Sequence, residues 1–170
     1  MKVLAYVGLG ANLGDMRQSL EHALAELAAL PASRLGAVSG AYRSAPVDAE
    51  GPDYLNAVAA LETELAPLAL LDALQAIELG LGRERPFWHA PRTLDLDLLL
   101  YGQQVIASAR LTVPHPELHR RAFVLQPLLE LAPDLQAPGL GALQPLLQGT
   151  REQAIERLPI TLSPLPRMTR

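Results

Sequence analysis

The residues best suited to chemistry lie in one short segment, 92–100, which reads RTLDLDLLL. Side chains alternate between the two faces of a β-strand, so Asp95 and Asp97 share one face and the leucines at 94, 96, 98 and 100 share the other. Two neighbouring carboxylates repel each other unless a cation lies between them. Mg²⁺ suits them because it binds carboxylate oxygens and keeps water and substrate phosphates in its shell. The alternative is a strand with one solvated face, although Asp is disfavoured in strands.

An arginine-rich loop immediately precedes these carboxylates. It spans residues 82–92, reads GRERPFWHAPR, and contains Arg83, Arg85 and Arg92. The planar guanidinium fork matches phosphate oxygens, so metal and arginine would meet on the same phosphorylated ligand. An exposed loop is the alternative, but Trp88, the only Trp of the chain, suggests a lid that closes over a flat ligand.

Three weaker features surround this centre. The prolines on either side of His115 fix its backbone, which suits contact with phosphate, although a structural His is the more common case. Gln75 and Glu78 are three residues apart on an expected helix and share a face, which in isolation indicates only a solvated surface. Residues 8–15, GLGANLGD, lack the ending of a P-loop and the glycine spacing of a dinucleotide fold. We interpret them as a strand-to-helix turn in which Asn12 touches the ligand.

Composition limits the classes of protein that remain. A chain of 170 residues favours one domain, and a net charge of −4 argues against general nucleic-acid binding. Cys is absent, which excludes disulfides and thiolate sites and indicates a reducing compartment. We therefore expect a cytoplasmic protein with no membrane partner, because no apolar run approaches the roughly 18 residues of a membrane span and the N-terminus does not resemble a signal peptide.

Hydrophobic periodicity predicts the elements that position these residues. We expect strands at Lys2–Leu9, Ala37–Arg43, Tyr54–Leu65, Thr93–Tyr101 and Leu111–Val113, and helices at Met16–Leu30, Pro67–Leu79 and His119–Leu131. The order β-α-β-β-α-β is that of a ferredoxin-like α+β unit. Residues 158–170 contain three prolines, and we expect them to fray.

Several of these motifs together resemble the 6-hydroxymethyl-7,8-dihydropterin pyrophosphokinase family of folate biosynthesis. They are GANLGD at 10–15, GPDYLN at 51–56, PRTLDLD at 91–97 and LTVPHP at 111–116. The resemblance runs from Val3 to Pro133. It implies a ferredoxin-like core with a mainly antiparallel sheet and helices on both faces, a three-layer αβα arrangement. We expect a single domain over 1–149 and a C-terminal extension over 150–170.

The resemblance also implies roles for individual residues. In the catalytic centre it places Arg83, Arg92, Asp95 and Asp97, with the two aspartates holding two Mg²⁺ ions. On the pterin side it places Asn12, Ser44, Ala45, Pro46, Val47, Tyr54, Asn56, Trp88 and Phe123. On the ATP side it places Gln75, Glu78, Arg85, Trp88, Arg92, Leu98, Arg110, Thr112, His115 and Arg121. By similarity, the residue at 56 reads the polar edge of the pterin ring and the aromatic at 123 stacks on its face.

The chain departs from the family pattern at three positions. His89 stands where many members have a stacking Trp, and Trp88, one residue earlier, is the candidate substitute. Pro116 replaces a Tyr that some members have, which removes a hydroxyl contact. Ser44 stands where Thr is usual.

The implied activity is transfer of a diphosphoryl group from ATP to the hydroxymethyl group of the pterin, with release of AMP. ATP and the pterin are then the expected partners, and we expect a monomer. Two other functions fit the same carboxylates: a metal-dependent phosphohydrolase that activates water, and a noncatalytic nucleotide-binding module. The first would form inorganic phosphate from ATP without a pterin, and the second would bind ATP without consuming it.

Overall fold

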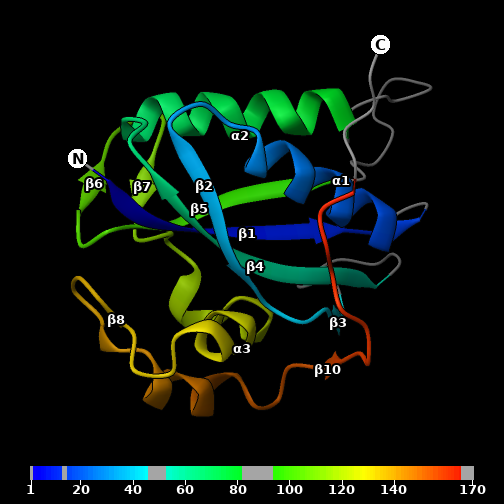
Figure 1. Cartoon of the computed structure of the whole chain (residues 1–170). Coiled ribbons are helices and arrows are strands. Elements are labelled where there is room, and N and C mark those ends of the chain that lie inside the picture. The colour runs from blue at the N-terminus through cyan, green and yellow to red at the C-terminus, as the bar shows by residue number, and fades with distance from the viewer. Residues whose placement is uncertain (1, 13–14, 46–52, 82–93, 166–170) are drawn as a thin grey trace.

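An antiparallel sheet forms the centre of the molecule (Figure 1). The computed structural model describes residues 2–12, 15–45, 53–81 and 94–165, and within them the sheet has six strands. These strands are β1 (Val3–Ala11), β2 (Ser33–Val38), β3 (Tyr42–Ser44), β4 (Tyr54–Thr63), β5 (Asp95–Tyr101) and β10 (Ile155–Arg157). Their order is β10-β3-β4-β1-β5, and β2 also pairs with β4. With β10 as an added edge strand, this is the expected ferredoxin-like arrangement.

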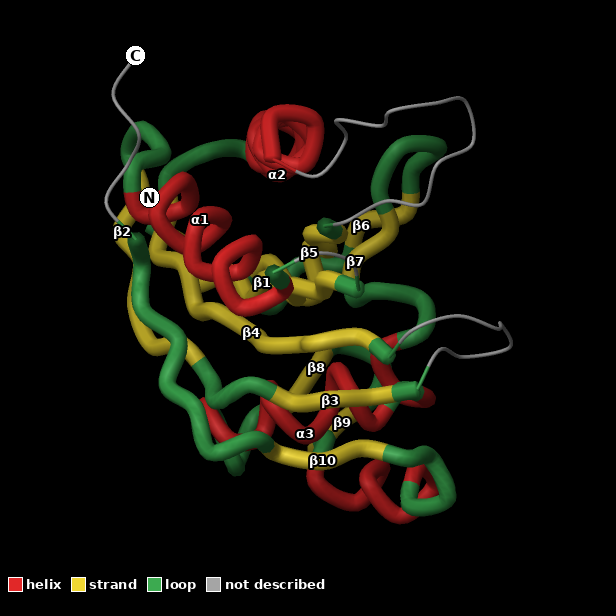
Figure 2. Tube along the Cα trace, turned by 90° about the vertical axis from the view of Figure 1, so that its right-hand side faces the viewer, coloured by secondary structure: helices red, strands yellow, loops and turns green. Residues whose placement is uncertain are grey.

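Helices cover both faces of the sheet, as predicted. Helices α1 (Met16–Ala28) and α2 (Pro67–Leu81) lie together over one face, and α3 (Ala122–Leu131) lies on the other (Figure 2). The side chain of Asp15 caps α1 by accepting a hydrogen bond from the Gln18 N–H at 3.1 Å. Pro67 begins α2, where its missing N–H costs no helical hydrogen bond.

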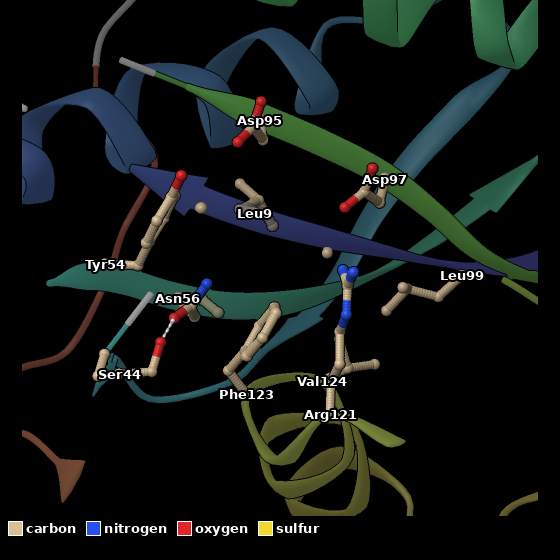
Figure 3. Close-up of a pocket in the computed structure, with 14 residues that line it drawn as sticks. Leu9, Ser44, Tyr54, Asn56, Asp95, Asp97, Leu99, Arg121, Phe123 and Val124 are labelled. Atoms are coloured by element: carbon tan, nitrogen blue, oxygen red, sulfur yellow. Dashed lines mark hydrogen bonds between the residues drawn. The ribbon is translucent and has the colours of Figure 1, made fainter. Parts of the chain in front are cut away.

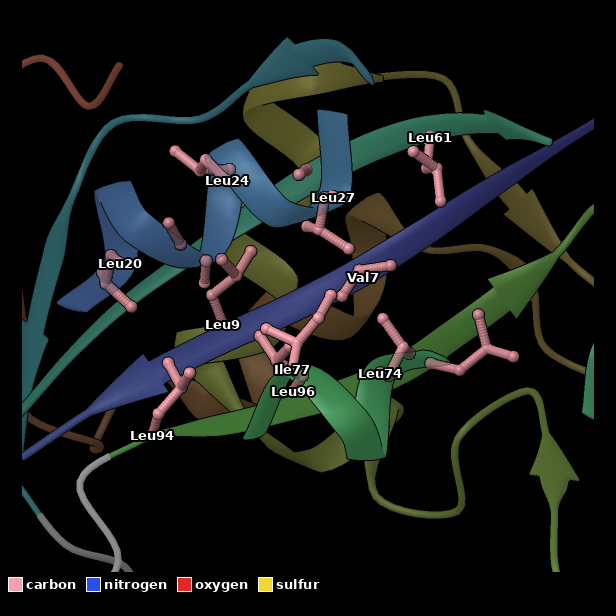
Figure 4. Close-up of a cluster of buried hydrophobic side chains, with 14 of the residues drawn as sticks. Val7, Leu9, Leu20, Leu24, Leu27, Leu61, Leu74, Ile77, Leu94 and Leu96 are labelled. Carbon is pink, nitrogen blue, oxygen red and sulfur yellow. The ribbon is translucent and has the colours of Figure 1, made fainter. Parts of the chain in front are cut away.

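Two apolar clusters, one on each face, hold these layers together. The cluster under α1 and α2 joins Leu20, Leu24 and Leu74 to Val7 and Leu61 of the sheet (Figure 4). The cluster under α3 joins helical leucines to sheet residues that include Tyr6, Val58, Leu99 and Leu100. The predicted alternation of β4 is confirmed, because Leu55, Ala57, Ala59 and Leu61 belong to the first cluster, and Val58 and Ala60 to the second.

A β-bulge corrects the alternation expected for β5. Tyr6 pairs with Leu100 and Val7 with Leu98, so Leu99 has no opposing residue of its own on β1. Leu94, Leu96 and Leu98 face α1 and α2 as expected, but Leu100 joins Leu99 in the cluster under α3. The expectation that Leu100 continues the first apolar face is therefore wrong.

The expected strand at Ala37–Arg43 is two strands, and Ser39 explains the break. The Ser39 backbone N–H donates to the Val58 carbonyl at 2.9 Å, and the Ser39 hydroxyl accepts from the Val58 N–H at 2.9 Å. One side chain thus replaces a bond of the ladder, with β2 on one side and β3 on the other. The expected helix at His119–Leu131 is likewise divided, into a 3₁₀ turn at Leu118–Arg120 and α3.

Short elements complete the chain after β5. They are β6 (Ile106–Ala107), β7 (Thr112–Val113), β8 (Gln136–Ala137), β9 (Gly141–Ala142) and the 3₁₀ segment Gln144–Thr150. The β6-β7 and β8-β9 pairs are separate two-stranded sheets.

The C-terminal segment is packed where we expected fraying. Leu162 is 5% exposed and belongs to the cluster under α1 and α2. The Ser163 N–H donates to the Glu21 carboxylate at 2.9 Å, and the Leu158 N–H to the Ala41 carbonyl at 2.8 Å. Residues 158–165 are therefore held by α1 and by the chain between β2 and β3.

A second set of bonds ties β10 to α3. The carboxylate of Glu130 accepts hydrogen bonds from the Gly40 N–H, the Tyr42 hydroxyl and the Arg157 guanidinium. Burial, together with the hydrogen bond to Glu130, raises the pKa of Tyr42 to about 12. Burial opposes ionisation of Glu130, but the bonds from Tyr42, Arg157 and Gly40 outweigh it and lower the Glu130 pKa.

Candidate active site

An open pocket lies between the sheet and the start of α3 (Figure 3). Its volume is about 220 Å³, several times the roughly 30 Å³ that a water molecule occupies in the liquid, so it has room for a small organic molecule. It is lined by Gly8, Leu9, Gly10, Ser44, Ala45, Tyr54, Asn56, Ala57, Asp95, Asp97, Leu99, Arg121, Phe123 and Val124. Segments far apart in the sequence therefore meet in one cavity.

The two aspartates of β5 project into this pocket together, as the strand alternation predicts. On the neighbouring strand β1, Gly10 lies opposite Asp95 and Gly8 lies opposite Asp97. A Cβ at Gly10 would lie 3.2 Å from the Asn56 amide nitrogen, and one at Gly8 would lie 3.4 Å from Leu99. Because neither glycine has a side chain, this part of β1 leaves the space beside the carboxylates unfilled.

Glu78 of α2 holds the backbone that carries these acids. Its carboxylate accepts a hydrogen bond from the Leu96 N–H at 2.8 Å, and Leu96 lies between Asp95 and Asp97. Glu78 is 6% exposed, whereas Gln75 on the same helix is exposed. The expected common face of Gln75 and Glu78 is therefore absent, because Glu78 is directed into β5.

A hydrogen-bonded pair forms the polar end of the pocket. The Ser44 hydroxyl donates to Asn56 Oδ1 at 2.6 Å, and Asn56 is 5% exposed. With its oxygen engaged, the Asn56 amide nitrogen lies on the Gly10 side of the pocket (Figure 3). Tyr54 lies beside it, and burial, together with the negative charge of Asp95, raises the Tyr54 pKa. This end of the pocket thus offers N–H donors to a ligand with acceptor atoms.

Arg121 and Phe123 complete the pocket from the start of α3. The Arg121 guanidinium lies 5.5 Å from the centre of the Phe123 ring and extends toward the sheet below Asp97 (Figure 3). The positive charge therefore stands across the pocket from the carboxylates. Phe123 presents a flat apolar surface beside the Ser44–Asn56 pair.

His115 lies close to the same charges, although it does not line the pocket. Burial lowers its pKa; the charge of Asp97 acts in the opposite direction, and Arg121 lowers it further. Its Nδ1 accepts a hydrogen bond from the Glu117 N–H at 3.1 Å, which places the proton of the neutral ring on Nε2. The backbone N–H of His115 donates to the Leu99 carbonyl at 3.0 Å, and this bond anchors His115 to β5.

The remaining predicted residues lie elsewhere or outside the described part of the chain. Leu98 is 3% exposed in the core, Arg110 pairs with Asp72 at the surface, and Thr112 is exposed on β7. Asn12 does not line the pocket, and its Oδ1 is buried without a hydrogen-bond partner among the described residues. The predicted contacts at Pro46, Val47, Arg83, Arg85, Trp88 and Arg92 lie outside the described residues.

Six further lining residues were not predicted: Gly8, Leu9, Gly10, Ala57, Leu99 and Val124. Gly8 and Gly10 escaped notice because residues 8–15 were interpreted as a turn, whereas β1 continues to Ala11. The sequence did contain a signal for this part of the pocket. If the strand is extended, Gly8 and Gly10 fall on the same face as Tyr6 and leave that face without side chains. Leu99 follows Asp95 and Asp97 at strand spacing, so alternation alone could have placed it on their face.

The donor set fits a magnesium ion that is shared with a substrate. Among residues 2–12, 15–45, 53–81 and 94–165, no group of three or more His, Asp or Glu side chains is arranged to hold a metal. Mg²⁺ usually takes only one or two protein carboxylates and completes its shell with water and phosphate oxygens. Asp95 and Asp97 on one open wall match that requirement.

Paired carboxylates facing an arginine across an open pocket are typical of phosphoryl-transfer enzymes. The family model described as 7,8-dihydro-6-hydroxymethylpterin-pyrophosphokinase (HPPK) matches residues 6–133. The chain belongs to this family.

Named relatives agree with this assignment, and a solved structure shows the same fold. The 2-amino-4-hydroxy-6-hydroxymethyldihydropteridine pyrophosphokinase of Pseudomonas aeruginosa is 52% identical over 155 residues, covering 91% of this chain and 96% of the relative. That of Haemophilus influenzae is 47% identical over 137 residues, covering 80% and 86%. A Plasmodium falciparum HPPK-DHPS structure superposes with a TM-score of 0.72 at 14% identity over 87% of this chain. The superposition spans 45% of that longer chain and shows the shared fold.

Within the part of the chain that the structure describes, every helix is too short or too polar to span a bilayer.

Proposed function

We propose that this pocket holds the pterin and the reacting end of Mg²⁺-ATP side by side. The chain then catalyses transfer of the diphosphoryl group of ATP to the hydroxymethyl oxygen of 6-hydroxymethyl-7,8-dihydropterin, with release of AMP. Family membership supports this reaction. The observation that carries it to these residues is that Asp95 and Asp97 share one cavity with the Ser44–Asn56 pair and Phe123.

The pterin ring occupies the end of the pocket beside β3 and β4. Its polar edge receives hydrogen bonds from the Asn56 amide nitrogen, because the Ser44 hydroxyl holds the Asn56 oxygen. Its face stacks on Phe123, a contact suited to a flat aromatic ligand. In this orientation the hydroxymethyl group points toward Asp95 and Asp97.

The phosphates of ATP occupy the end of the pocket beside β5. Mg²⁺ held by Asp95 and Asp97 supplies charge neutralisation for the phosphate oxygens when it is bound. Arg121 adds positive charge from the opposite wall, and His115 places a neutral imidazole near it. Arg83, Arg85, Arg92 and Trp88 remain predicted contacts from the loop before β5.

The reaction forms a bond from the hydroxymethyl oxygen to the β-phosphorus and breaks the bond from that phosphorus to the oxygen bridging to the α-phosphate. That oxygen leaves with AMP, and the hydroxyl proton passes to solvent. The described residues contribute by positioning both substrates and by stabilising charge that develops on the phosphate oxygens.

A single assay distinguishes this function from the two alternatives. Purified protein is incubated with ATP and Mg²⁺, with and without the pterin, and AMP and inorganic phosphate are measured. We expect AMP only when the pterin is present. Inorganic phosphate formed without pterin would identify a phosphohydrolase. Binding of ATP with no product in either mixture would identify a noncatalytic module.

We also propose that the protein is a cytoplasmic monomer. The absence of cysteine from the sequence suits a reducing compartment. Light scattering during size-exclusion chromatography tests the oligomeric state, and fractionation of cells that express the protein tests the compartment.

A further inference from the structure

The amide side chain of Gln153 makes hydrogen bonds to the backbone on both sides of Arg121. Its nitrogen donates to the Arg120 carbonyl at 2.6 Å, and its oxygen accepts from the Ala122 N–H at 2.9 Å. The two bonded groups belong to the peptide units that precede and follow Arg121. One planar amide therefore holds the backbone from which the guanidinium extends into the pocket.

The bond from the Ala122 N–H to Gln153 also caps α3, which has no capping hydrogen bond from its own N-cap residue. Arg121 occupies the N-cap position with an extended backbone, φ −119° and ψ 116°, and its side chain makes no capping hydrogen bond. The first N–H groups of a helix have no partner within the helix. Gln153 satisfies the first of them from 31 residues away, which leaves the Arg121 side chain directed into the pocket.

Gln153 itself is held firmly enough to act as a support. The backbone N–H of Gln153 donates to the Thr150 carbonyl at 2.9 Å, at the end of the 3₁₀ segment Gln144–Thr150. Two residues later the chain enters β10, where Ile155 pairs with Ser44 of β3. Gln153 and Ile155 line a second hollow of about 190 Å³, which shares Ser44, Ala45 and Phe123 with the pocket. Gln153 therefore lies next to the part of the pocket wall that Phe123 forms.

We propose that Gln153 is a positioning residue for phosphoryl transfer, acting through Arg121. Residue 153 lies beyond the span 6–133 that defines the family match, so the proposal assigns a catalytic contribution to the C-terminal segment. It rests on the proposed function, in which Arg121 meets the phosphates of ATP. A charged group displaced by about 1 Å can cost up to about a hundredfold in rate, so the hold on its backbone has a measurable consequence.

A double-mutant cycle on Gln153 and Arg121 tests the proposal. AMP release is measured for the wild type, Gln153→Ala, Arg121→Ala and the double variant, at a temperature well below the lowest unfolding midpoint. We expect Gln153→Ala to lower kcat about tenfold in the wild-type background. In the Arg121→Ala background we expect the same change to have an effect below about twofold, because its target is already gone.

A purely structural role gives a different result. If Gln153 only stabilised α3, its removal would reduce kcat by the same factor in both backgrounds, and that equal loss would overturn the proposal. Wild-type kcat in Gln153→Ala would overturn it as well. Failure of the proposed function is distinguishable, because then the wild type itself releases no pterin-dependent AMP. Wild-type kcat in Arg121→Ala would instead remove Arg121 from the mechanism, and the proposal with it.

Two further variants keep the test informative if Gln153→Ala folds poorly. Gln153→Glu keeps an acceptor for the Ala122 N–H, and its negative charge suits a helix N-terminus, so we expect a wild-type unfolding midpoint. It cannot donate to the Arg120 carbonyl, so we expect kcat to fall severalfold. Wild-type kcat in Gln153→Glu would show that this bond does not position Arg121. Glu152→Ala, an exposed neighbour, is the matched control, and we expect no change in kcat.

Discussion

The two faces of the same sheet are built for different purposes. The face under α1 and α2 is apolar along the strands, with Leu61, Val7 and Leu96 buried beneath the helices. The face under α3 is apolar only in part, where Val58, Leu99 and Leu100 meet α3. Toward the ends of β4 and β5 that carry Tyr54 and Asp95, it becomes the pocket. Because side chains alternate, β1, β4 and β5 each present core residues to one face and site residues to the other, so folding and chemistry are largely separable by face.

The largest expected effect comes from the acids of the pocket face. Replacing Asp97 with Ala, or Asp95 with Ala, should lower kcat for AMP release about a thousandfold. Each change removes a proposed Mg²⁺ ligand, so the charge on the phosphate oxygens is no longer neutralised. The unfolding midpoint should change little, since neither side chain belongs to the core. Asp134→Asn, an exposed acid after α3, is the control. Turnover within about tenfold of wild type in both pocket variants would contradict the assigned site.

The opposite face should show the reverse pattern. Leu24→Ala removes a side chain that is 0% exposed under α1 and should cost about 3 kcal/mol of unfolding free energy in urea. The kcat of the folded protein should be unchanged, because Leu24 does not line the pocket. Leu79→Ala, at a position 60% exposed on α2, should cost less than about 0.5 kcal/mol. A large loss of kcat in Leu24→Ala would show that the two faces are coupled.

A smaller effect is expected at the polar end of the pocket. Ser44→Ala removes the donor to Asn56 Oδ1 and leaves a buried acceptor free to rotate. We expect about tenfold weaker pterin binding, the equivalent of about 1.4 kcal/mol, measured by fluorescence titration with Mg²⁺ and a nonhydrolysable ATP analogue. Ser44→Thr keeps the hydroxyl and should bind normally. Equal affinity in the Ala and Thr variants would remove Ser44 from pterin recognition.

The smallest expected effect depends on pH and concerns Glu130, which ties α3 to β10. The lowered pKa of Glu130 means that the folded state favours its carboxylate, so this group stabilises the fold at pH values above its ordinary 4.5. The contribution disappears as pH falls through the lowered pKa. Glu130→Gln should therefore cost about 1 kcal/mol at neutral pH, and the difference from wild type should shrink below pH 4.5. A constant difference at all pH values would mean that shape, not charge, is what Glu130 contributes.

The sequence was most informative where one element decides the outcome. The facing of β4 and the shared side of Asp95 and Asp97 follow from strand periodicity alone, and both are confirmed. Pairing between elements decided the rest. The bulge at Leu99 depends on its partner β1, and the break at Ser39 depends on β4. The contact of Glu78 with the Leu96 N–H was not foreseen either, because helix spacing does not reveal which neighbouring strand a side chain meets; its contact with ATP stays a prediction.

The C-terminal segment was the region least accessible to sequence reasoning. Its prolines and weak periodicity predicted fraying, yet Leu162 and the Glu21 carboxylate hold it against α1. These contacts join positions more than 140 residues apart, which no local pattern reports. Gln153 is a further case, because a single polar residue after a 3₁₀ segment carries no signal until α3 lies beside it.

Strand β10 also has a consequence for how copies of the protein behave toward one another. An uncovered strand offers a row of unpaired N–H and C=O groups to other chains, and short, charged outer strands discourage such contact. β10 is three residues long and carries exposed Glu156 and Arg157, so it is a poor template. A chain that ended before Ile155 would leave β3 open and the site of Leu162 empty, and we expect it to aggregate even with every pocket residue in place.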